Sequence, residues 1–142
     1  MDSVVRVLLR VMPPIDRLLL TVSGGRFGSA PGRTLLLVTT GARSGQRRET
    51  PLFFVRDGAR LVLIASKGGS RSHPDWYRNL RAHPECEVVL DGGTWRYRAR
   101  DAAGAERERL WRLACDAYAG YQAYAERARP REIPVVVLES AA

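Results

Sequence analysis

The sequence has few of the residues that build metal sites, disulfides and catalytic triads. Among its 142 residues are only two cysteines, Cys86 and Cys115, and two histidines, His73 and His83. The cysteines lie far apart without a C-x-x-C pattern, so both are predicted to be buried thiols of a reducing cytoplasm. Each histidine precedes a proline, and no serine lies in a G-x-S-x-G elbow. These absences argue against hydrolytic chemistry and against a metal site.

Long hydrophobic runs are also missing. The apolar stretches near the N-terminus are interrupted by Arg6, Arg10, Asp16 and Arg17, and they are shorter than the roughly 20 apolar residues of a spanning helix. No signal-peptide pattern is present. Hydrophobic residues make up 45% of the chain and charged residues 27%, which is typical of a soluble globular protein with one core. The predicted location is therefore cytoplasmic.

The sequence has fewer acidic than basic residues. There are 23 lysines and arginines against 15 aspartates and glutamates, which gives a formal net charge of +8. Lys67 is the only lysine, and the other 22 of these cations are arginines. Such a balance predicts an anionic partner, which could be nucleic acid, a phosphorylated cofactor or a membrane surface. Charge alone does not choose among the three.

The N-terminal part differs from the rest. Residues 1–32 are predicted to be a helical and linker segment, because two amphipathic pieces around Pro13-Pro14 are followed by a Gly/Ser/Pro-rich connector. Residues 33–142 are predicted to be the main domain. Arg6 and Arg10 on an apolar helix fit two interpretations: a helix lying across the domain, or a basic helix that makes peripheral contact with anionic lipid at the inner face of the cell membrane.

From residue 33 the pattern changes to strands. Strands are predicted in residues 34–40, in a hairpin over 50–66, in a second hairpin over 85–101, and in residues 133–138. Asp57-Gly58 is a strong turn signal for the first hairpin. Trp95, Tyr97 and Ala99 alternate with arginines, which predicts that these three share a half-buried face. About six strands with few crossover helices indicate a small, mainly antiparallel barrel.

Two helical regions interrupt the strands. Helix 74–82 begins with Pro74 and Asp75, both favourable at a helix N-terminus. Residues 105–128 have helical spacing, with Gly120 expected to weaken the helix by about 1 kcal/mol and to permit a close approach or a bend. The stripe that includes Tyr118, Tyr121 and Tyr124 could be core, as aromatic stripes usually are. Tyrosine in place of phenylalanine indicates hydroxyl groups at a pocket wall.

Three features could bind an anion at one rim of the barrel. The stretch "GARSGQRR" places Arg43, Arg47 and Arg48 in a glycine-bounded turn, which suits phosphate or carboxylate oxygens, although a solvated basic loop would look the same. The glycine pair in "ASKGG" predicts a sharp bend or a close approach to another group. Neighbouring Lys67 and Arg71 suggest that this group is anionic. The N-terminus of the helix beginning at "PDWYRN" would favour an anion too.

Together these stretches resemble the deazaflavin-dependent nitroreductase family, split β-barrel proteins that use coenzyme F420. The family pattern is G-x-x-[ST]-G-x-x-R-x-x-P-L, then A-S-x-G-G, then P-x-W-Y-x-N-L-x-A-x-P. This sequence matches it at Gly41, Ser44, Gly45, Arg48, Pro51, Leu52, Ala65, Ser66, Gly68, Gly69, Pro74, Trp76, Tyr77, Asn79, Leu80, Ala82 and Pro84. The likeness runs from about residue 33 to the end. It implies a split β-barrel of the FMN-binding type.

The resemblance also implies where the coenzyme lies. Coenzyme F420 is a planar deazaflavin with a phosphate and an oligoglutamate tail, and Arg43, Ser44 and Arg48 would contact the phosphate and tail. The remaining coenzyme contacts implied are Thr50, Pro51, Leu52 and Phe53 beside the ring, Ala65, Ser66, Lys67 and Gly68 from the next strand and turn, and Trp76, Tyr77, Arg78 and Asn79 from the helix.

The implied reaction is hydride transfer from the reduced deazaflavin to an electron-poor small molecule such as a quinone, an enone or a nitroaromatic. Ser66, Tyr118, Tyr121 and Tyr124 would face this acceptor, and a hydroxyl among them could hydrogen-bond it as negative charge develops. A proton could equally come from solvent. Where an aromatic hydroxyl is expected on the second strand, this chain has Phe53 and Phe54, so that hydrogen bond is absent.

Three alternatives stay open from the sequence. The split barrel also accommodates FMN, so an FMN-dependent oxidoreductase is the nearest. A carrier that binds the deazaflavin without reducing anything is a second alternative. A basic nucleic-acid-binding barrel would need stacking aromatics spread among cations on a strand face, and only "TWRYRAR" fits that description. A nucleic-acid partner is therefore not expected.

Overall fold

The computed structural model describes residues 33–141, so the predictions for the N-terminal segment, including its membrane contact, lie outside the described residues. The strands are β1 (Thr34–Thr40), β2 (Arg47–Phe53), β3 (Val55–Asp57), β4 (Arg60–Ile64), β5 (Glu85–Leu90), β6 (Gly93–Asp101) and β7 (Val135–Ser140). The helices are the short 3-10 helix η1 (Lys67–Gly69), α3 (Asp75–Ala82), α4 (Gly104–Ala117) and α5 (Gly120–Ala128). In this part of the chain no helix has the length and apolar character needed to cross a membrane.

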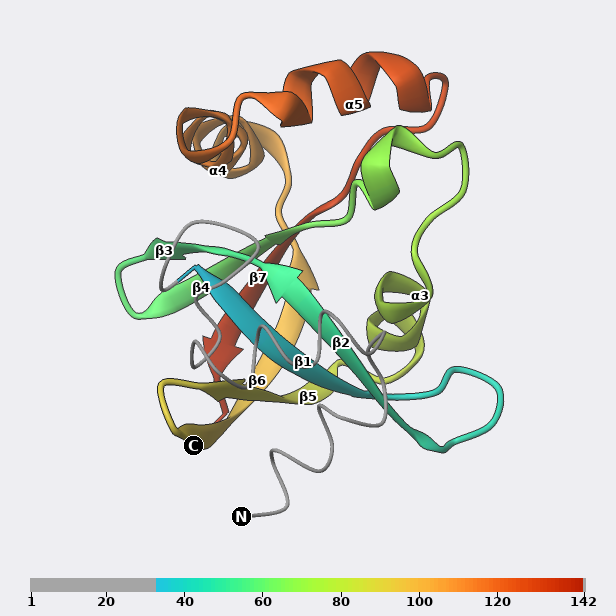
Figure 1. Cartoon of the computed structure of the whole chain (residues 1–142), viewed down its shortest axis with the longest axis vertical. Coiled ribbons are helices and arrows are strands. Elements are labelled where there is room, and N and C mark those ends of the chain that lie inside the picture. The colour runs from blue at the N-terminus through green and yellow to red at the C-terminus, as the bar shows by residue number, and fades with distance from the viewer. Residues whose placement is uncertain (1–32, 142) are drawn as a thin grey trace, which may run out of the picture.

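All seven strands form one antiparallel sheet in the order β2-β1-β5-β6-β7-β4-β3, shown in Figure 1. The two outer strands, β2 and β3, are consecutive in the chain and are separated only by Phe54, which is 2% exposed. The sheet therefore curls until its edges meet at Phe54, where the backbone N–H donates to the Arg33 carbonyl at 2.8 Å. The prediction of a split barrel is confirmed.

The first predicted hairpin is divided. Its turn at Asp57-Gly58 is confirmed, with Gly58 at φ 63°, but only Val55–Asp57 pairs with β4. The residues before Phe54 pair with β1 instead. The prediction of one strand before the Asp57-Gly58 turn is therefore wrong. The chain forms two strands there, because it changes its pairing partner where the two edges of the sheet meet.

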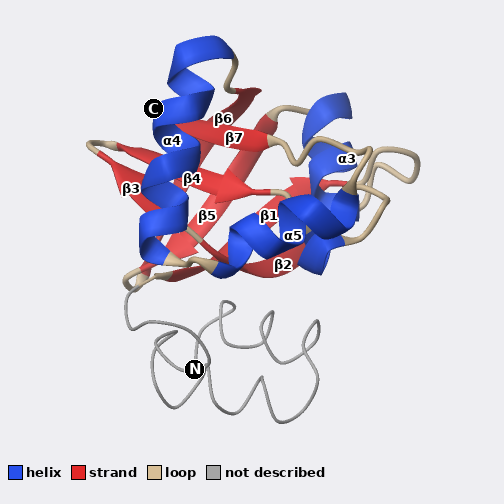
Figure 2. Cartoon of the chain, turned by 90° about the horizontal axis from the view of Figure 1, so that it is seen from above, coloured by secondary structure: helices blue, strands red, loops and turns tan. Residues whose placement is uncertain are grey.

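The apolar runs are continuous because several strands are buried on both faces. Leu61 and Leu63 of β4 face the barrel interior, where they belong to one cluster with Trp76 of α3. The intervening Val62 faces the other way and packs in a second cluster with Leu110 of α4. Figure 2 looks down on α4 and α5, which cover the same side of the sheet. Side chains alternate between the two cores with the period of a strand.

The expected helix over 105–128 is two helices. α4 ends at Ala117, and Tyr118 has an extended backbone with φ −150° and ψ 101°. α5 then begins at Gly120, where an added Cβ would lie 2.4 Å from the ring of Tyr118. The chain therefore bends beside Gly120, as predicted, and the close approach that glycine permits is that of the Tyr118 ring.

Two burial predictions are wrong. Trp95 is 48% exposed, whereas Tyr97 and Ala99 on the same face are half-buried. The indole of Trp95 folds over Gly93, where an added Cβ would lie 2.4 Å from the ring, and does not reach a core. Cys86 is buried as expected, but Cys115 is only half-buried because α4 presents it at the margin of the second cluster.

Candidate active site

An open groove of about 1020 Å³ lies between the β1–β2 loop and the first turns of α3, which are neighbours at one end of the barrel in Figure 1. The structure brings seven of the predicted coenzyme-binding residues to its walls, namely Arg43, Ser44, Arg48, Thr50, Trp76, Arg78 and Asn79. The walls also carry Arg47 and two carboxylates, Glu49 and Asp75. The groove is therefore lined by more cations than anions.

The loop is shaped by its two glycines. The N–H of Gly41 donates to the Gln46 carbonyl at 2.8 Å, and the N–H of Gly45 donates to the Gly41 carbonyl at 3.0 Å. Gly45 has φ 69°, a left-handed conformation that favours glycine. A Cβ on Gly41 would lie 2.5 Å from the Ser44 hydroxyl. The loop thus closes on itself and leaves Arg43 exposed at its tip.

Asn79 fixes this loop against α3. Its side-chain Oδ1 accepts a hydrogen bond from the Ala42 N–H at 2.9 Å, and its Nδ2 donates to the Thr39 hydroxyl at 3.2 Å. The residue is 8% exposed. Because its carbonyl and its amino group both hold protein partners, we interpret Asn79 as a residue that positions the loop. Sequence reasoning selected it only as a direct coenzyme contact.

The arginines of the groove are not equivalent. The Nε of Arg47 lies 2.9 Å from Glu49, which neutralises it. The side chains of Arg43 and Arg48 make no hydrogen bond or ion pair with any residue in the range 33–141. Both are exposed, so their guanidinium groups are free to bind an oxyanion in a bidentate manner. The donor set fits the phosphate and carboxylates of a deazaflavin coenzyme.

The N-terminus of α3 adds to this field. Pro74 is the N-cap and provides no side-chain hydrogen bond, so the first N–H groups of the helix are not capped by it. The helix N-terminus carries partial positive charge. Asp75 in the first turn is 92% exposed at its side chain and lies 3.4 Å from Arg78. The helix therefore contributes an anion-favouring end together with one weak ion pair.

The Lys67-Gly68-Gly69 turn has a different neighbour from the one expected. All three residues have positive φ, at 47°, 61° and 86°. A Cβ on Gly69 would lie 2.9 Å from Cβ of Arg127 and 3.0 Å from the carbonyl of Tyr124. The close approach predicted from the glycine pair is therefore made by Gly69 to α5, and an anion beside Lys67 and Gly68 stays a prediction. Lys67 itself is exposed and donates to the Ser72 hydroxyl at 3.2 Å.

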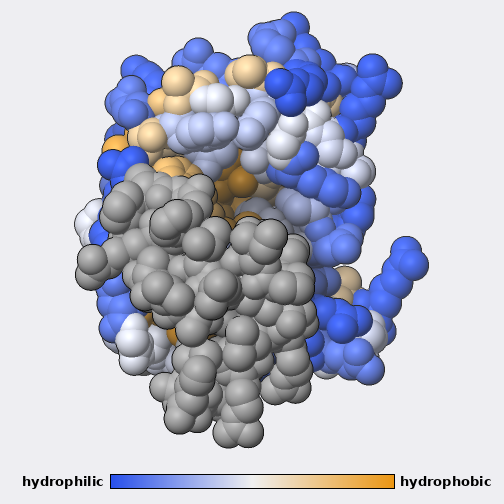
Figure 3. All heavy atoms as spheres, viewed as in Figure 1, coloured by the Kyte–Doolittle hydropathy of each residue, from blue (hydrophilic) through white to orange (hydrophobic). Residues whose placement is uncertain are grey.

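The three tyrosines gather with Phe53 at the junction of α4 and α5. The ring of Phe53 lies 6.2 Å from that of Tyr118 and 6.3 Å from that of Tyr121. The hydroxyls of Tyr118 and Tyr124 are 2.9 Å apart. We call these four residues, Phe53, Tyr118, Tyr121 and Tyr124, the aromatic cluster. Figure 3 shows hydrophobic residues gathered beneath α4 and α5, where the surface is hollowed.

The surroundings of Tyr118 and Tyr121 in the aromatic cluster favour the neutral form of each phenol. Burial raises the pKa of Tyr121, which is 6% exposed. The hydrogen bond with Tyr124 raises the pKa of Tyr118, which is 42% exposed. Both groups therefore carry their protons at neutral pH. One proton lies between the Tyr118 and Tyr124 oxygens, and the second is left for another acceptor.

Strand β2 connects the groove to the aromatic cluster. Thr50 lines the groove and Phe53 belongs to the cluster, three positions further along the strand. At about 3.3 Å per residue this is a separation of about 10 Å along the strand. Side chains three positions apart point to opposite faces of a strand, so an elongated ligand with an anionic end and a planar end would have to pass the edge of β2 to contact both.

Some predicted residues lie elsewhere. Tyr77 is on a different side of α3, where its hydroxyl donates to Asp101 at 2.8 Å and accepts from Arg81 at 3.0 Å. It lines a separate cleft of about 220 Å³, and burial raises its pKa. Pro51 and Leu52 are half-buried in β2 and do not line the groove. Ala65 and Ser66 are buried at the end of β4, where the turn begins.

One residue was missed. Arg131 hydrogen-bonds the turn that follows β4, although its acceptors are 58 to 66 positions earlier in the sequence. No local motif marks it. Only its place between two prolines, Pro130 and Pro134, with the charged neighbour Glu132, could have drawn attention to it.

Comparison with known proteins is consistent across sequence and structure. The family model described as F420H(2)-dependent quinone reductase matches residues 8–140. An F420H(2)-dependent quinone reductase of Mycobacterium tuberculosis is 36% identical over 133 residues, which cover 92% of this chain and 89% of that protein. The solved structure of an F420-H2 dependent reductase, FDR-A, is 39% identical with a TM-score of 0.69, covering 75% of this chain and 94% of that one. A further structure, described as a domain-swapped dimer, has the same identity and TM-score and covers 75% and 80%.

Proposed function

The chain belongs to the F420H(2)-dependent quinone reductase family, and from this premise we propose that it reduces quinones at a site that extends from the groove along β2 to the aromatic cluster. As a member of that family it is an oxidoreductase whose cofactor is coenzyme F420. The observation that carries the proposal is that Arg43 and Arg48, which have no carboxylate partner within residues 33–141, lie near the start of β2, while a hydrogen-bonded phenol pair lies beside Phe53 at its end.

Arg43 and Arg48 would hold the anionic end of the coenzyme. Each can donate two parallel N–H bonds to a phosphate or carboxylate, and neither has a carboxylate partner within residues 33–141. Ser44 and the N-terminus of α3 lie on the same walls. The planar ring would then lie toward Phe53, and the backbone of Ala65–Gly68, which follows β4, would contact it from the turn.

Tyr118 and Tyr124 would bind the acceptor. When bound, the reduced coenzyme supplies the hydride, and negative charge then develops on a quinone oxygen. The one phenolic proton not used within the Tyr118–Tyr124 pair can be donated to that oxygen. Phe53 and the buried Tyr121 keep the remaining walls apolar and limit the access of water.

The test begins with paired fluorescence titrations of the purified protein with F420 and with FMN at low and moderate salt. We expect micromolar or tighter binding of F420 and much weaker binding of FMN. Steady-state reduction of a short-chain naphthoquinone by F420H2 then measures turnover. Failure of F420 to bind would overturn the proposed site.

The phenol pair is tested with Tyr124→Phe. This variant should keep near-normal affinity for F420, because the ring and its packing stay. Its kcat should fall about tenfold, because the remaining Tyr118 phenol loses the hydrogen bond that orients and polarises it. Tyr97→Phe is the matched control, because Tyr97 lies on β6 away from the aromatic cluster. Wild-type turnover of Tyr124→Phe with several quinones would exclude a hydroxyl role.

A further inference from the structure

Arg131 uses all of its hydrogen-bond donors within the protein. A guanidinium group has five N–H donors. Here Nε donates to the Ser70 carbonyl at 2.9 Å, Nη1 to the Ala65 carbonyl at 3.0 Å, and Nη2 to the carbonyls of Ser66 and Ser70 at 2.8 and 2.7 Å. The remaining Nη1 donor lies 3.0 Å from Nδ1 of His73. No donor is left for a ligand.

The charge of Arg131 is not neutralised locally. No carboxylate of residues 33–141 forms an ion pair with it, and burial lowers its pKa. A half-buried cation held only by carbonyl oxygens and a neutral imidazole costs desolvation energy. Arg131 is therefore better explained by the conformation that it imposes on the turn after β4 than by a favourable ion pair.

The backbone that Arg131 holds is strained. Lys67 has φ 47°, an unfavourable conformation for a residue with a side chain. The carbonyls bound by Arg131 lie on both sides of Lys67, at Ala65 and Ser66 before it and at Ser70 after it. Strained turns of this kind persist only when their surroundings fix them. The guanidinium group supplies that fixation.

We propose that Arg131 is a positioning residue for hydride transfer, because it fixes the Ala65–Ser70 backbone at the distance from β2 and α5 that the coenzyme ring requires. The inference rests on the proposed function, in which this turn contacts the ring. The same turn packs against α5 at Gly69. Arg131 therefore sets both the backbone beside the ring and the surface on which the helix of Tyr124 rests.

The experiment compares Arg131→Lys with Arg107→Lys. A lysine keeps the charge but cannot bond the same set of acceptors with one ammonium group. Arg107 is the matched control, since its Nη2 donates to the Ile133 carbonyl at 2.6 Å and its Nε lies 3.3 Å from Glu132. It therefore supports the segment next to Arg131 without reaching the turn.

Two readouts are needed. Amide hydrogen exchange of Gly69 and Ser70 reports the turn directly, because their N–H groups donate to the carbonyls of Ser66 and Lys67 at 2.9 and 3.1 Å. Exchange of the β4 amides in the same sample reports global unfolding, so local loosening is separated from a general loss of stability. The second readout is the Kd for F420 together with kcat for naphthoquinone reduction.

We expect Arg131→Lys to raise exchange at Gly69 and Ser70 above that of β4, to weaken F420 binding about tenfold and to lower kcat about 100-fold through misplacement. Arg107→Lys should change none of these by more than about twofold. Unchanged exchange at the turn would overturn the inference. So would a loosened turn with wild-type Kd and kcat. If the unaltered protein failed to bind F420, the proposed function would fall, and exchange would still decide whether Arg131 holds the turn.

Discussion

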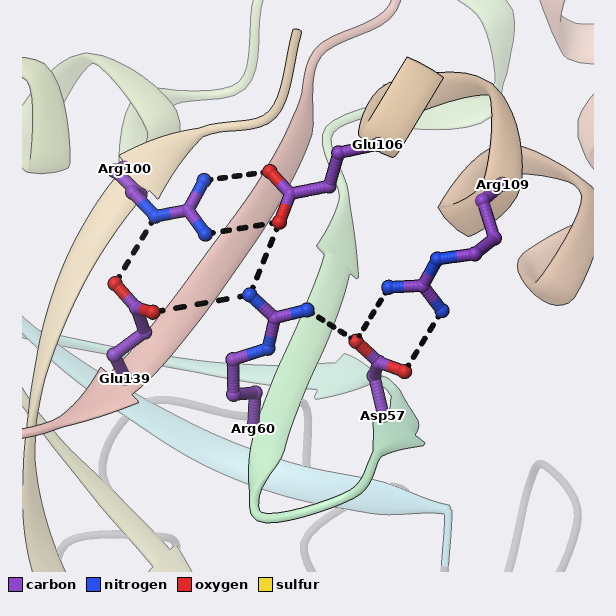
Figure 4. Close-up of polar contacts among 6 residues, drawn as sticks. All are labelled: Asp57, Arg60, Arg100, Glu106, Arg109 and Glu139. Carbon is purple, nitrogen blue, oxygen red and sulfur yellow. Dashed lines mark hydrogen bonds and ion pairs between the residues drawn. The ribbon is translucent and has the colours of Figure 1, made fainter.

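Arginines occur in two contrasting regions of the molecule, the groove and an ion-pair network along α4. The network, shown in Figure 4, consists of Asp57, Arg60, Arg100, Glu106, Arg109 and Glu139. Arg100 donates to both oxygens of Glu106 at 2.7 and 3.0 Å, and Arg109 lies 3.0 Å from each oxygen of Asp57. In the groove, by contrast, Arg43 and Arg48 have no such partner among the described residues.

The network joins elements that are far apart in sequence. Arg60 on β4 contacts Glu106 on α4 at 3.0 Å, and Arg100 on β6 contacts Glu139 on β7 at 3.0 Å. Arg100 and then Arg60 lower the pKa of Glu106 to about 2. Arg109 and Arg60 lower the pKa of Asp57 in the same way. These charges are used to dock α4 on the sheet and are not available to a ligand.

The contrast shows that the net charge of a chain does not locate its anion site. Arg100 and Arg48 contribute equally to the formal charge of +8, but only the guanidinium without a carboxylate neighbour attracts an external anion without first giving up an ion pair. Arg131 is a third kind, because its donors are taken by backbone carbonyls. The partners of each arginine decide its role.

The sharpest test replaces one arginine from each region. Arg48→Ala should weaken F420 binding about 10- to 100-fold at low salt, since a charge-assisted hydrogen bond contributes about 1.5–3 kcal/mol. This loss should shrink as salt is raised. Arg100→Ala should lower the melting temperature and leave the Kd for F420 unchanged. Fluorescence titrations and thermal melts of the two variants measure these effects. Equal changes in the Kd for F420 would show that the groove and network arginines do not differ in their role in coenzyme binding.

The next largest effect concerns the residue that holds the groove loop. Asn79→Ala leaves the Ala42 N–H and the Thr39 hydroxyl without their partner, which should cost about 2 kcal/mol of unfolding free energy. Movement of the loop should also weaken F420 binding several-fold. Thr39→Val is the matched variant, because it removes one of the two bonds and leaves Ala42 held. Denaturant unfolding with F420 titration measures both, and an F420 affinity lowered equally by both variants would contradict the role given to Ala42.

A smaller effect is expected from the pH dependence of the network. The pKa of Glu106 is 4.5 ordinarily and about 2 in the folded protein, so its stabilisation is complete above pH 4.5 and is lost as the pH falls toward 2. Glu106→Gln should melt at a lower temperature than the unaltered protein at pH 6. The difference should narrow as the pH falls. A difference that stays constant between pH 6 and pH 3 would show that the ion pairs do not contribute.

The smallest effect belongs to His73. Its Nδ1 accepts from Arg131, which requires a neutral ring with the proton on Nε2. Burial, and then the charge of Arg131, lower its pKa from 6.5. A lowered pKa means that stability is complete above pH 6.5 and falls as acid protonates the unfolded chain first. The His73→Asn variant keeps a neutral hydrogen-bond acceptor, so its melting temperature should fall less between pH 7.5 and 5.5 than that of the unaltered protein. Parallel losses would rule His73 out as the cause.

The sequence was informative wherever a motif is local. Gly41, Ser44 and Arg48 belong to one glycine-bounded turn, and their spacing predicted the groove wall that the structure shows. The turn at Asp57-Gly58 and the break at Gly120 were predictable for the same reason. Trp95 was not, because strand alternation says which residues share a face but not whether anything covers that face.

The sequence by itself determined the barrel class, the family and the residue types of an anionic coenzyme site, because hydrophobic period, turn chemistry and motif spacing are local properties of the chain. Only the tertiary structure decided which arginines have no carboxylate partner within residues 33–141, that Asn79 and Arg131 hold the loop and the turn, and that α5 is the close neighbour of Gly69. The physical reason is that a side chain's charge and hydrogen bonds are used by whichever groups folding brings beside it, and these lie tens of residues away in sequence.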